Sequence, residues 1–334
     1  MVKKLFKGFL ALILVFIVLV FCKLQFIGKK FDAAAFEPYL LKQPAYTHPI
    51  RLTYLGTSCF IIGYKDKQII LDPFFSNPNL LSSAFGKLKY PNLSDRIDSN
   101  LYNHVSMITI SHGHYDHCLD IRNFLRANNN LTIAADPGIL NELTSVFQNK
   151  AIQQDPIVKN SKKEWIYSPD SSFRVFALPS THSPHFDHVT LFTGSYEQPL
   201  PSLPGKLWDW KLCECNSYLV DLLDNGVVTY RVLMCTGNMN PDGKADLQKL
   251  SKERKTDLLL HIFWKKEQCW DNLNEMYLIA RPGLVLLHHW NNFFRSNDKP
   301  LQYLRSSELP EVLEELNNNG IPVKIMPPFS TVDL

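Results

Sequence analysis

Outside its N-terminus the chain has no dense run of basic residues, and its formal net charge is only +3. Nucleic-acid-binding proteins usually carry a clustered positive surface, so nucleic acid is not an expected partner. Cysteine is sparse: seven thiols are scattered over 334 residues, which excludes the dense framework of a small disulfide-stapled domain. No internal repeat is visible. The chain is 45% hydrophobic, and its length suits one or two globular domains with a large core.

The first 28 residues are predicted to be a membrane anchor. Residues 8–22 are uncharged and mostly apolar, and further apolar residues follow. An apolar helix needs about 20 residues to cross the hydrocarbon core, a length that is reached if the flanking lysines extend toward the head groups. The alternatives are a signal peptide cleaved near Ala33 and Ala35, or a lipoprotein acylated at Cys22. Lysines flank both ends, so the positive-inside rule favours a catalytic domain outside the cytoplasm only weakly.

Residues 29–48 are expected to form a linker, and residues 49–334 one globular domain. Strands are predicted at 51–55, 59–63, 68–72, 104–110, 131–134, 173–178, 216–222, 227–235, 258–263 and 284–287. Helices are predicted at 120–127, 138–148, 242–252, 272–280 and 307–318. Strands therefore precede helices, twice over. This order predicts two sheets packed together with helices outside, in one α/β domain.

A short segment after the strand at 104–110 is dense in metal ligands. It reads His112-Gly113-His114-Tyr115-Asp116-His117. Imidazole nitrogen and carboxylate oxygen are common ligands of zinc and similar divalent ions. The motif follows a buried strand and enters a loop, where functional side chains lie over a rigid scaffold. Its spacing therefore predicts a metal site rather than solvated surface histidines.

Two further histidines follow predicted strands. His182 comes shortly after the strand at 173–178, and His289 follows the strand at 284–287. Strand ends at one edge of stacked sheets converge in space, and a catalytic zinc takes about three protein ligands plus water. We therefore predict both as ligands. For either one alone, a hydrogen-bonded core histidine is the alternative.

Aromatic and imidazole side chains near these ligands are candidates to line a substrate site. The proline-rich segment 183–211 contains His185, Trp208 and Trp210, and Trp290 follows the last predicted ligand. A mobile aromatic flap would suit an apolar or lipid substrate. For the tryptophans, packing in the core is the alternative reading.

Together these residues resemble the metallo-β-lactamase-fold superfamily over residues 50–330. Residues 52–58 are similar to its opening strand and glycine turn, and Asp72 to its structural aspartate. The most similar branch contains N-acyl-phosphatidylethanolamine phospholipase D and the ascorbate-phosphate lactonase. There, as in residues 289–293, the last histidine precedes an aromatic residue and a Phe. The resemblance implies a four-layer αββα sandwich.

The resemblance also implies how the ligands divide between two metals. One metal would be held by His112, His114 and His182, and the other by Asp116, His117 and His289. The family normally bridges both metals with an aspartate in a Gly-Asp pair, and here Asn238 takes that place. One or two Zn²⁺ ions per chain are therefore expected, with another divalent metal as the alternative. Asn238 and Asp72 are candidates to ligate metal or to support its ligands.

The function implied is metal-dependent hydrolysis of an ester, lactone or phosphodiester. A metal-bound hydroxide would attack, and Asp116 would orient the water. The predicted anchor favours a phospholipid-type phosphodiester, although a small-molecule substrate remains open. The alternatives are a non-catalytic ligand-binding member of the fold and an iron-dependent thiol oxidoreductase. The oligomeric state stays open.

Overall fold

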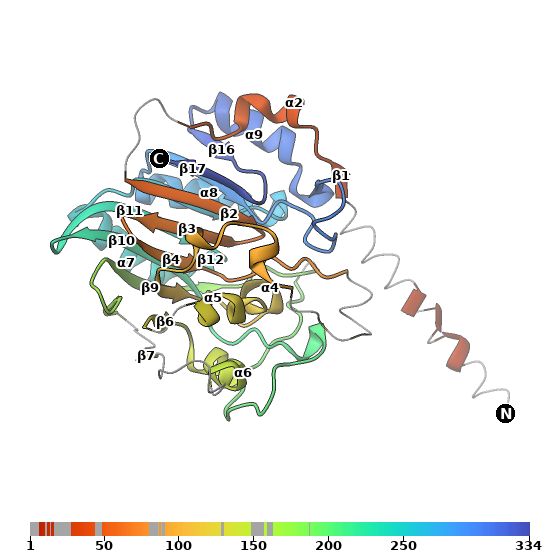
Figure 1. Ribbon diagram of the computed structural model, residues 1–334. Helices are drawn as coiled ribbons and strands as arrows, with labels where there is room; N and C mark the ends of the chain where they lie inside the picture. The colour runs from red at the N-terminus through yellow and green to blue at the C-terminus, as the bar shows by residue number, and fades with distance from the viewer. Residues whose placement is uncertain are drawn as a thin grey trace.

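Two mixed β-sheets packed face to face form the body of the molecule in the computed structural model (Figure 1). The structure describes residues 7–10, 12–13, 15–16, 28–43, 49–79, 86, 88, 91–127, 130–147, 157–158, 163–186 and 188–334. Helices lie on the outer faces of the sheets. This arrangement agrees with the predicted order of strands and helices.

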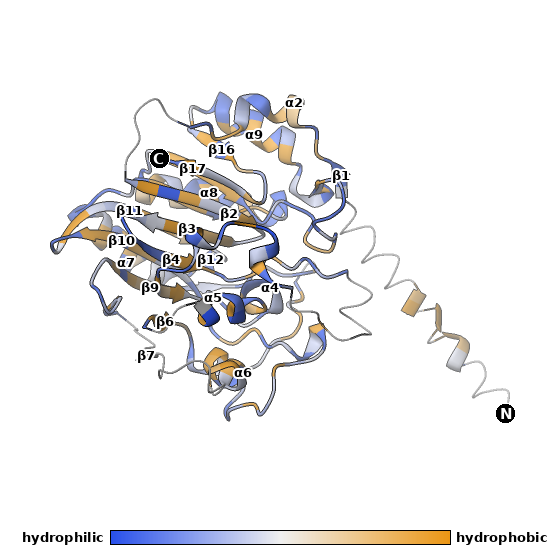
Figure 2. Ribbon diagram, in the orientation of Figure 1, coloured by the Kyte–Doolittle hydropathy of each residue, from blue (hydrophilic) through white to orange (hydrophobic). Residues whose placement is uncertain are grey.

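The first sheet has the strand order β17-β2-β3-β4-β5-β6-β7. Its strands are β2 (Ile50–Gly56), β3 (Cys59–Tyr64), β4 (Lys67–Leu71), β5 (Val105–Thr109), β6 (Thr132–Ala134), β7 (Ile157–Val158) and β17 (Ser330–Asp333). β2, β3 and β4 pair antiparallel, whereas β4, β5, β6 and β7 pair parallel. At the start of β2, apolar and polar residues alternate between the two faces of the sheet (Figure 2).

The second sheet has the order β12-β9-β10-β11-β13-β14-β16, and β8 pairs with β9. Its strands are β8 (Trp165–Tyr167), β9 (Phe173–Thr181), β10 (Cys215–Asp224), β11 (Val227–Cys235), β12 (Asn238–Met239), β13 (Leu258–Ile262), β14 (Leu284–His288) and β16 (Val323–Ile325). β13 and β14 are apolar except for one histidine each. Parallel strands covered on both faces have this pattern, because both sides of each strand are buried.

Each predicted helix overlaps one in the structure, although the helix expected at 272–280 begins at residue 266 and the one-turn helix at 115–118 was not predicted. The helices are α4 (Tyr115–Cys118), α5 (Ile121–Ala127), α6 (Pro137–Phe147), α7 (Pro241–Glu253), α8 (Lys266–Ala280) and α9 (Leu309–Asn318). In α7, Asn240 caps the first turn by accepting the Gly243 N–H, and Pro241 occupies the first turn. In α9 the buried residues recur every three or four positions, which gives one apolar face: Leu309, Val312, Leu313 and Leu316.

Short one-turn 3₁₀ helices interrupt the loops: η1 (Glu37–Tyr39), η2 (Leu93–Asp95), η3 (Ser99–Leu101), η4 (Leu207–Asp209) and η5 (Arg305–Ser307). η2 and η3 lie in the long segment between β4 and β5, which the sequence predicts to be irregular. They place Leu93 in the core, so this segment packs against the domain.

Residues 28–43 contribute to the domain, in contrast to the linker expected at 29–48. β1 (Gly28–Lys30) pairs antiparallel with β15 (Gln302–Leu304), and α2 (Ala33–Phe36) follows. The Phe36 side chain is only 3% exposed and belongs to the hydrophobic core. Aromatic residues at this point therefore attach the chain to the sandwich directly after the predicted anchor. Residues 44–48 lie outside the described residues.

Most of the predicted anchor, namely residues 1–6, 11, 14 and 17–27, lies outside the described residues. Within the part of the chain that the structure describes, no helix has the length and apolar character to cross a membrane. The described residues of 7–16 are helical, and Phe9, Leu12 and Phe16 are each more than 60% exposed.

Candidate metal centre

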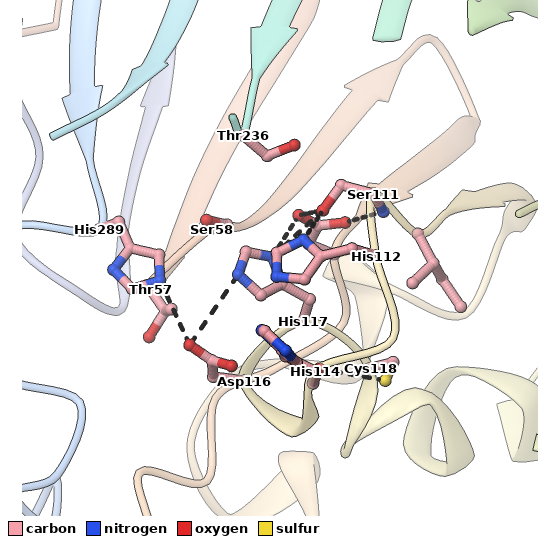
Figure 3. Close-up of polar contacts among 12 residues, drawn as sticks. Thr57, Ser58, Ser111, His112, His114, Asp116, His117, Cys118, Thr236 and His289 are labelled. Carbon is pink, nitrogen blue, oxygen red and sulfur yellow. Dashed lines mark hydrogen bonds and ion pairs between the residues drawn. The ribbon is translucent and has the colours of Figure 1, made fainter. Parts of the chain in front are cut away.

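The six predicted ligands meet at one edge of the two sheets, in two groups (Figure 3 labels all of them except His182). The His112 group comprises His112, His114 and His182, and the Asp116 group comprises Asp116, His117 and His289. Within each group the ligand atoms lie within 4.8 Å of one another. The ligands come from the loop after β5 and from the ends of β9 and β14. Strand ends that are far apart in the sequence therefore build the site.

The two groups adjoin each other. The ring centroids of His112 and His117 are 3.9 Å apart, and those of His112 and His182 are 4.9 Å apart. Asp116 Oδ2 lies 3.3 Å from His289 Nε2 and 3.9 Å from His117 Nε2. The arrangement therefore has donor atoms for two neighbouring ions.

Asp72 holds the metal motif in place through hydrogen bonds. Its carboxylate accepts the Ser111 backbone N–H at 2.7 Å, the Ser111 hydroxyl at 2.7 Å and His117 Nδ1–H at 2.7 Å (Figure 3). Because the Ser111 hydroxyl donates to Asp72, its oxygen accepts His112 Nδ1–H at 3.1 Å. The protons of both imidazoles are thus held on Nδ1, and each Nε2 keeps its lone pair.

The other histidines of the His112 group are oriented by backbone groups. His182 Nδ1 donates to the Ser183 carbonyl at 2.6 Å. His114 is hydrogen-bonded to the Leu191 backbone. His112 Nε2 and His114 Nε2 are buried and have no hydrogen-bond partner. Buried nitrogen atoms are rarely left without a partner, and a divalent cation would satisfy both, so these residues fit a metal.

Burial keeps the three histidines of the His112 group neutral. It lowers the pKa of His112 and His182 well below the usual value and that of His114 to about 3. Burial alone would raise the pKa of Asp116, but the adjacent His117 and His289 lower it overall. Neutral imidazole and ionised carboxylate are the protonation states that ligate metal.

Two residues of the centre have left-handed backbone conformations. Asp72 follows β4 with φ 46°, and His289 follows β14 with φ 63°. For residues other than glycine this conformation costs about 1–3 kcal/mol, and it persists only where the surroundings enforce it. His289 is held by its N–H, which donates to the Thr57 carbonyl at 2.6 Å. The chain thus turns sharply after each strand and directs a side chain into the site.

The glycine between the first two histidines allows a close approach of another segment. Gly113 N–H donates to the Leu212 carbonyl at 2.9 Å, and a Cβ at this position would collide with the Lys211 carbonyl. It would also lie 2.8 Å from Glu142 Oε2. Glu142 accepts the Lys211 N–H at 2.9 Å and is fully buried, which raises its pKa to about 9. The segment 206–213 therefore packs directly against the loop that carries His112 and His114.

Asn238 lies away from the end of β11. It begins β12, where its backbone pairs with Thr181 of β9, and its side chain is half-buried. The residue that directly follows β11 is Thr236, which is 1% exposed. Its hydroxyl donates to the Asn216 carbonyl at 3.2 Å, and Figure 3 shows Thr236 among the site residues. Sequence reasoning missed Thr236, because the Gly237-Asn238 pair resembled the family's Gly-Asp pair.

Of the candidate substrate-lining residues, two tryptophans are part of the core. Trp210 and Trp290 are both fully buried, so their indole rings pack rather than line an open surface. Trp208 is half-buried, and Lys206 Nζ lies 5.4 Å from its ring centroid. Tryptophan in an irregular segment is ambiguous from sequence, because its large ring suits both settings.

His185 lies at the metal centre. Its ring stacks on that of His182 with centroids 4.7 Å apart, and its Nδ1 accepts the Leu191 N–H at 3.1 Å. The proton of the neutral ring is therefore on Nε2. His185 and His182 are both half-buried, whereas the other five ligands are buried, so the site is most accessible on their side.

Ser58, which was not predicted, and His288 support the strand ends beside the site. Ser58 donates to His288 Nδ1 at 3.1 Å, and His288 Nε2 donates to the Cys235 carbonyl at 3.1 Å. This chain of hydrogen bonds joins the ends of β14 and β11 to the turn before β3. The only sequence signal was the position of His288, whose side chain points away from that of its neighbour along the strand.

Comparison with known proteins agrees with this architecture. Residues 67–196, which include the His-x-His-x-Asp-His motif and His182, match the model of the β-lactamase superfamily domain. No curated protein matches the chain.

Three solved structures share the fold at low identity. A possible metal-dependent hydrolase from Veillonella parvula has 13% identity and a TM-score of 0.52, with 86% of this chain and 100% of that chain covered. Igni18, a metallo hydrolase from Ignicoccus hospitalis, has 18% identity and a TM-score of 0.51, covering 85% and 97%. CmlA, a diiron β-hydroxylase from Streptomyces venezuelae, has 12% identity and a TM-score of 0.51, covering 86% and 55%.

Residues 67–196 therefore resemble a β-lactamase superfamily domain, the chain shares the α/β fold of these structures with its two mixed sheets, and its described residues include two His/Asp clusters that could hold a metal ion. The comparisons indicate neither a branch of the superfamily nor a substrate.

Proposed function

We propose that this protein hydrolyses an ester, lactone or phosphodiester with the help of one or two divalent metal ions, zinc being favoured. The observation that carries the proposal is the pair of ligand groups, in which His112, His117 and His182 have their protons held on Nδ1, so that Nε2 keeps its lone pair. Such a preorganised donor set suits a metal that keeps an open position for water and substrate.

When bound, the metal would lower the pKa of a coordinated water and stabilise the negative charge that develops on the attacked group. The chain's own residues supply the rest. Asp116 Oδ2 lies between His117 and His289, where it can ligate and also accept a proton from a water on the open side. Asp72 keeps His117 in the ligating tautomer.

His185 is the residue best placed to contact substrate. Its Nε2 carries the proton, and its ring stacks on His182, the most accessible ligand. An N–H at this place can donate a hydrogen bond to an oxygen atom of an ester or phosphate group.

The substrate class is proposed from the chain as a whole. The likeness of residues 289–293 to the phospholipase D and lactonase branch supports a phosphodiester or lactone. Exposed apolar residues at 7–16 support attachment to a membrane by the N-terminus, with the domain outside the cytoplasm, and hence a phospholipid-type phosphodiester. A soluble small molecule is the alternative substrate.

The first test is metal content and hydrolysis by the purified full chain. Zinc and iron are measured per chain by elemental analysis, because the diiron β-hydroxylase CmlA has the same fold. Activity is then measured on model esters, lactones and phosphodiesters and on phospholipid vesicles, with and without a chelator. We expect bound zinc and at least one activity that the chelator abolishes and added zinc restores.

The matched variants are His114→Ala, which removes a ligand, and His104→Ala, which removes an exposed histidine elsewhere in the domain. His114→Ala should lose metal and activity, whereas His104→Ala should keep both. A wild type that contains no zinc and stays inactive when zinc is supplied would favour the alternative of a non-catalytic ligand-binding protein. Stoichiometric iron with thiol oxidation would favour the oxidoreductase alternative.

Membrane attachment is tested separately. The full chain should fractionate with membranes and resist extraction by high salt, and a variant lacking residues 1–27 should be released. Accessibility of the domain to protease in intact cells then reports its side of the membrane.

A further inference from the structure

The strand that precedes the superfamily domain is packed against the loop of the last metal ligand. Phe31, directly after β1, stacks on Trp290 with ring centroids 5.4 Å apart. Trp290 is fully buried and adjoins His289 in the sequence. An N-terminal aromatic residue thus contacts the immediate neighbour of a ligand of the Asp116 group.

Backbone hydrogen bonds attach this strand to the end of the same loop. β1 pairs with β15 in the register Gly28↔Leu304, and Phe31 N–H donates to the Leu301 carbonyl at 3.0 Å. Leu304 N–H in turn donates to the Trp290 carbonyl at 2.7 Å. The loop 289–304 therefore has its start joined to its end, and its end joined to β1.

Stacked aromatic rings secure the strand itself. Phe31 stacks on Phe36 with centroids 4.6 Å apart and an interplanar angle of 3°, and Phe36 packs edge-on against Tyr303 of β15 at 5.6 Å. Offset aromatic pairs stabilise a contact beyond the effect of their buried area. We name residues 28–36 the N-terminal strap. Its two phenylalanines, Phe31 and Phe36, join Tyr303 to Trp290 in a continuous series of aromatic contacts.

The ligand at this loop needs such support. His289 has a left-handed backbone with φ 63°, which an unrestrained histidine would relax from. On its other side the turn is fastened through Asn291, whose Oδ1 accepts the Thr57 N–H at 2.7 Å and the Tyr54 hydroxyl at 2.9 Å. Asn291 and Trp290 thus anchor the residues that follow His289 from two directions.

We propose that the N-terminal strap positions His289 and thereby sets the metal affinity of the Asp116 group, with Phe31 acting through Trp290 as the positioning residue. This inference rests on the proposed metal-dependent function and adds a segment that lies outside the matched superfamily domain. The His112 group has no ligand in the loop 289–304, so its affinity should not depend on the strap.

The test compares three full-length variants. Phe31→Ala removes the ring that stacks on Trp290, and Phe31→Tyr restores an aromatic ring. Tyr39→Ala is the matched control, because it removes a partly buried aromatic from η1, next to the Leu40–Ile325 bridge at β16. Zinc affinity is measured by chelator competition, in the natural background and with His182→Ala, which disables the His112 group.

Phe31→Ala should weaken binding at the Asp116 group by about tenfold, a loss typical of a disturbed support of a metal ligand. Phe31→Tyr and Tyr39→Ala should bind as the parent does. In metal-free protein, amide hydrogen exchange in the peptide 289–304 should be faster for Phe31→Ala than for Tyr39→Ala.

Unchanged affinity and exchange in Phe31→Ala, or an equal loss in Tyr39→Ala, would overturn the proposal. Metal binding without hydrolysis would count against the proposed function but not against the proposed role of the strap. If the wild type bound no metal, hydrogen exchange alone would decide whether the strap holds the loop.

Discussion

His117 donates its Nδ1 proton to Asp72 at 2.7 Å, so a ligand from the loop after β5 is oriented by a carboxylate at the end of β4. Both side chains are 1% exposed. The same carboxylate holds Ser111, which holds His112. One aspartate therefore sets the tautomers of ligands in both groups, and the following predictions begin with it.

Replacing Asp72 by Asn should weaken metal binding by about 10–100-fold without unfolding the protein. Asparagine tolerates the left-handed backbone at φ 46°, so the variant changes the charge and one acceptor but keeps the turn. Chelator competition measures the loss. Asp66→Asn, at an exposed turn before β4, is the control and should bind metal as the wild type does. Equal affinities for both variants would contradict the role of Asp72.

Thr236→Asp should increase the affinity for a second ion, whereas Asn238→Asp should not. Thr236 follows β11 directly and is buried at the site, while Asn238 is half-buried and paired with β9. A carboxylate at the first position would add negative charge beside the ligand groups. Zinc stoichiometry after dialysis against limiting zinc checks this. The reverse order of the two variants would show that β12 carries the bridging position.

Gly113→Ala should destabilise the domain by several kcal/mol, whereas Gly205→Ala should be nearly neutral. A Cβ on Gly113 meets a backbone carbonyl that cannot move aside easily, but one on Gly205 has nothing within 4 Å. Thermal unfolding of the metal-free proteins measures both. If Gly113→Ala unfolds at the wild-type temperature, the close approach of residues 211–213 is not rigid.

The wild type should lose stability as the pH rises, and the Glu142→Gln variant should lose less. The folded pKa of Glu142 is about 9 and its ordinary value is 4.5, so between these values the native state holds a proton that the unfolded state has lost. The free energy of unfolding therefore falls as the pH rises from about 4.5 toward about 9. At pH 7 the difference is on the order of 3 kcal/mol.

Urea unfolding of metal-free protein at pH 5 and pH 8 tests this prediction. In Glu142→Gln the side-chain amide keeps an oxygen that can accept the Lys211 N–H, and it has no proton to lose. The free energy of unfolding should change less with pH in this variant than in the wild type. Parallel pH dependences would mean that Glu142 is ionised in the folded protein.

Much of the fold could be predicted from local patterns. The strands at 227–235 and 284–287 appear as β11 and β14 within a residue, because β14 is a buried apolar run and β11 is rich in β-branched residues. β15, β16 and β17 were missed. Each has only three or four residues, and their pairing partners lie far away in the sequence, so no local period marks them.

The sequence by itself determined the chemistry of the centre, because residue type decides which atoms can ligate and motif spacing places four of them on one loop. Only the tertiary structure decided which residue follows β11 into the site, which tryptophans are buried, and that residues 28–36 pack against the loop that follows His289. The physical reason is register. A shift of one residue reverses the direction of a side chain, and register between distant strands depends on packing throughout the domain.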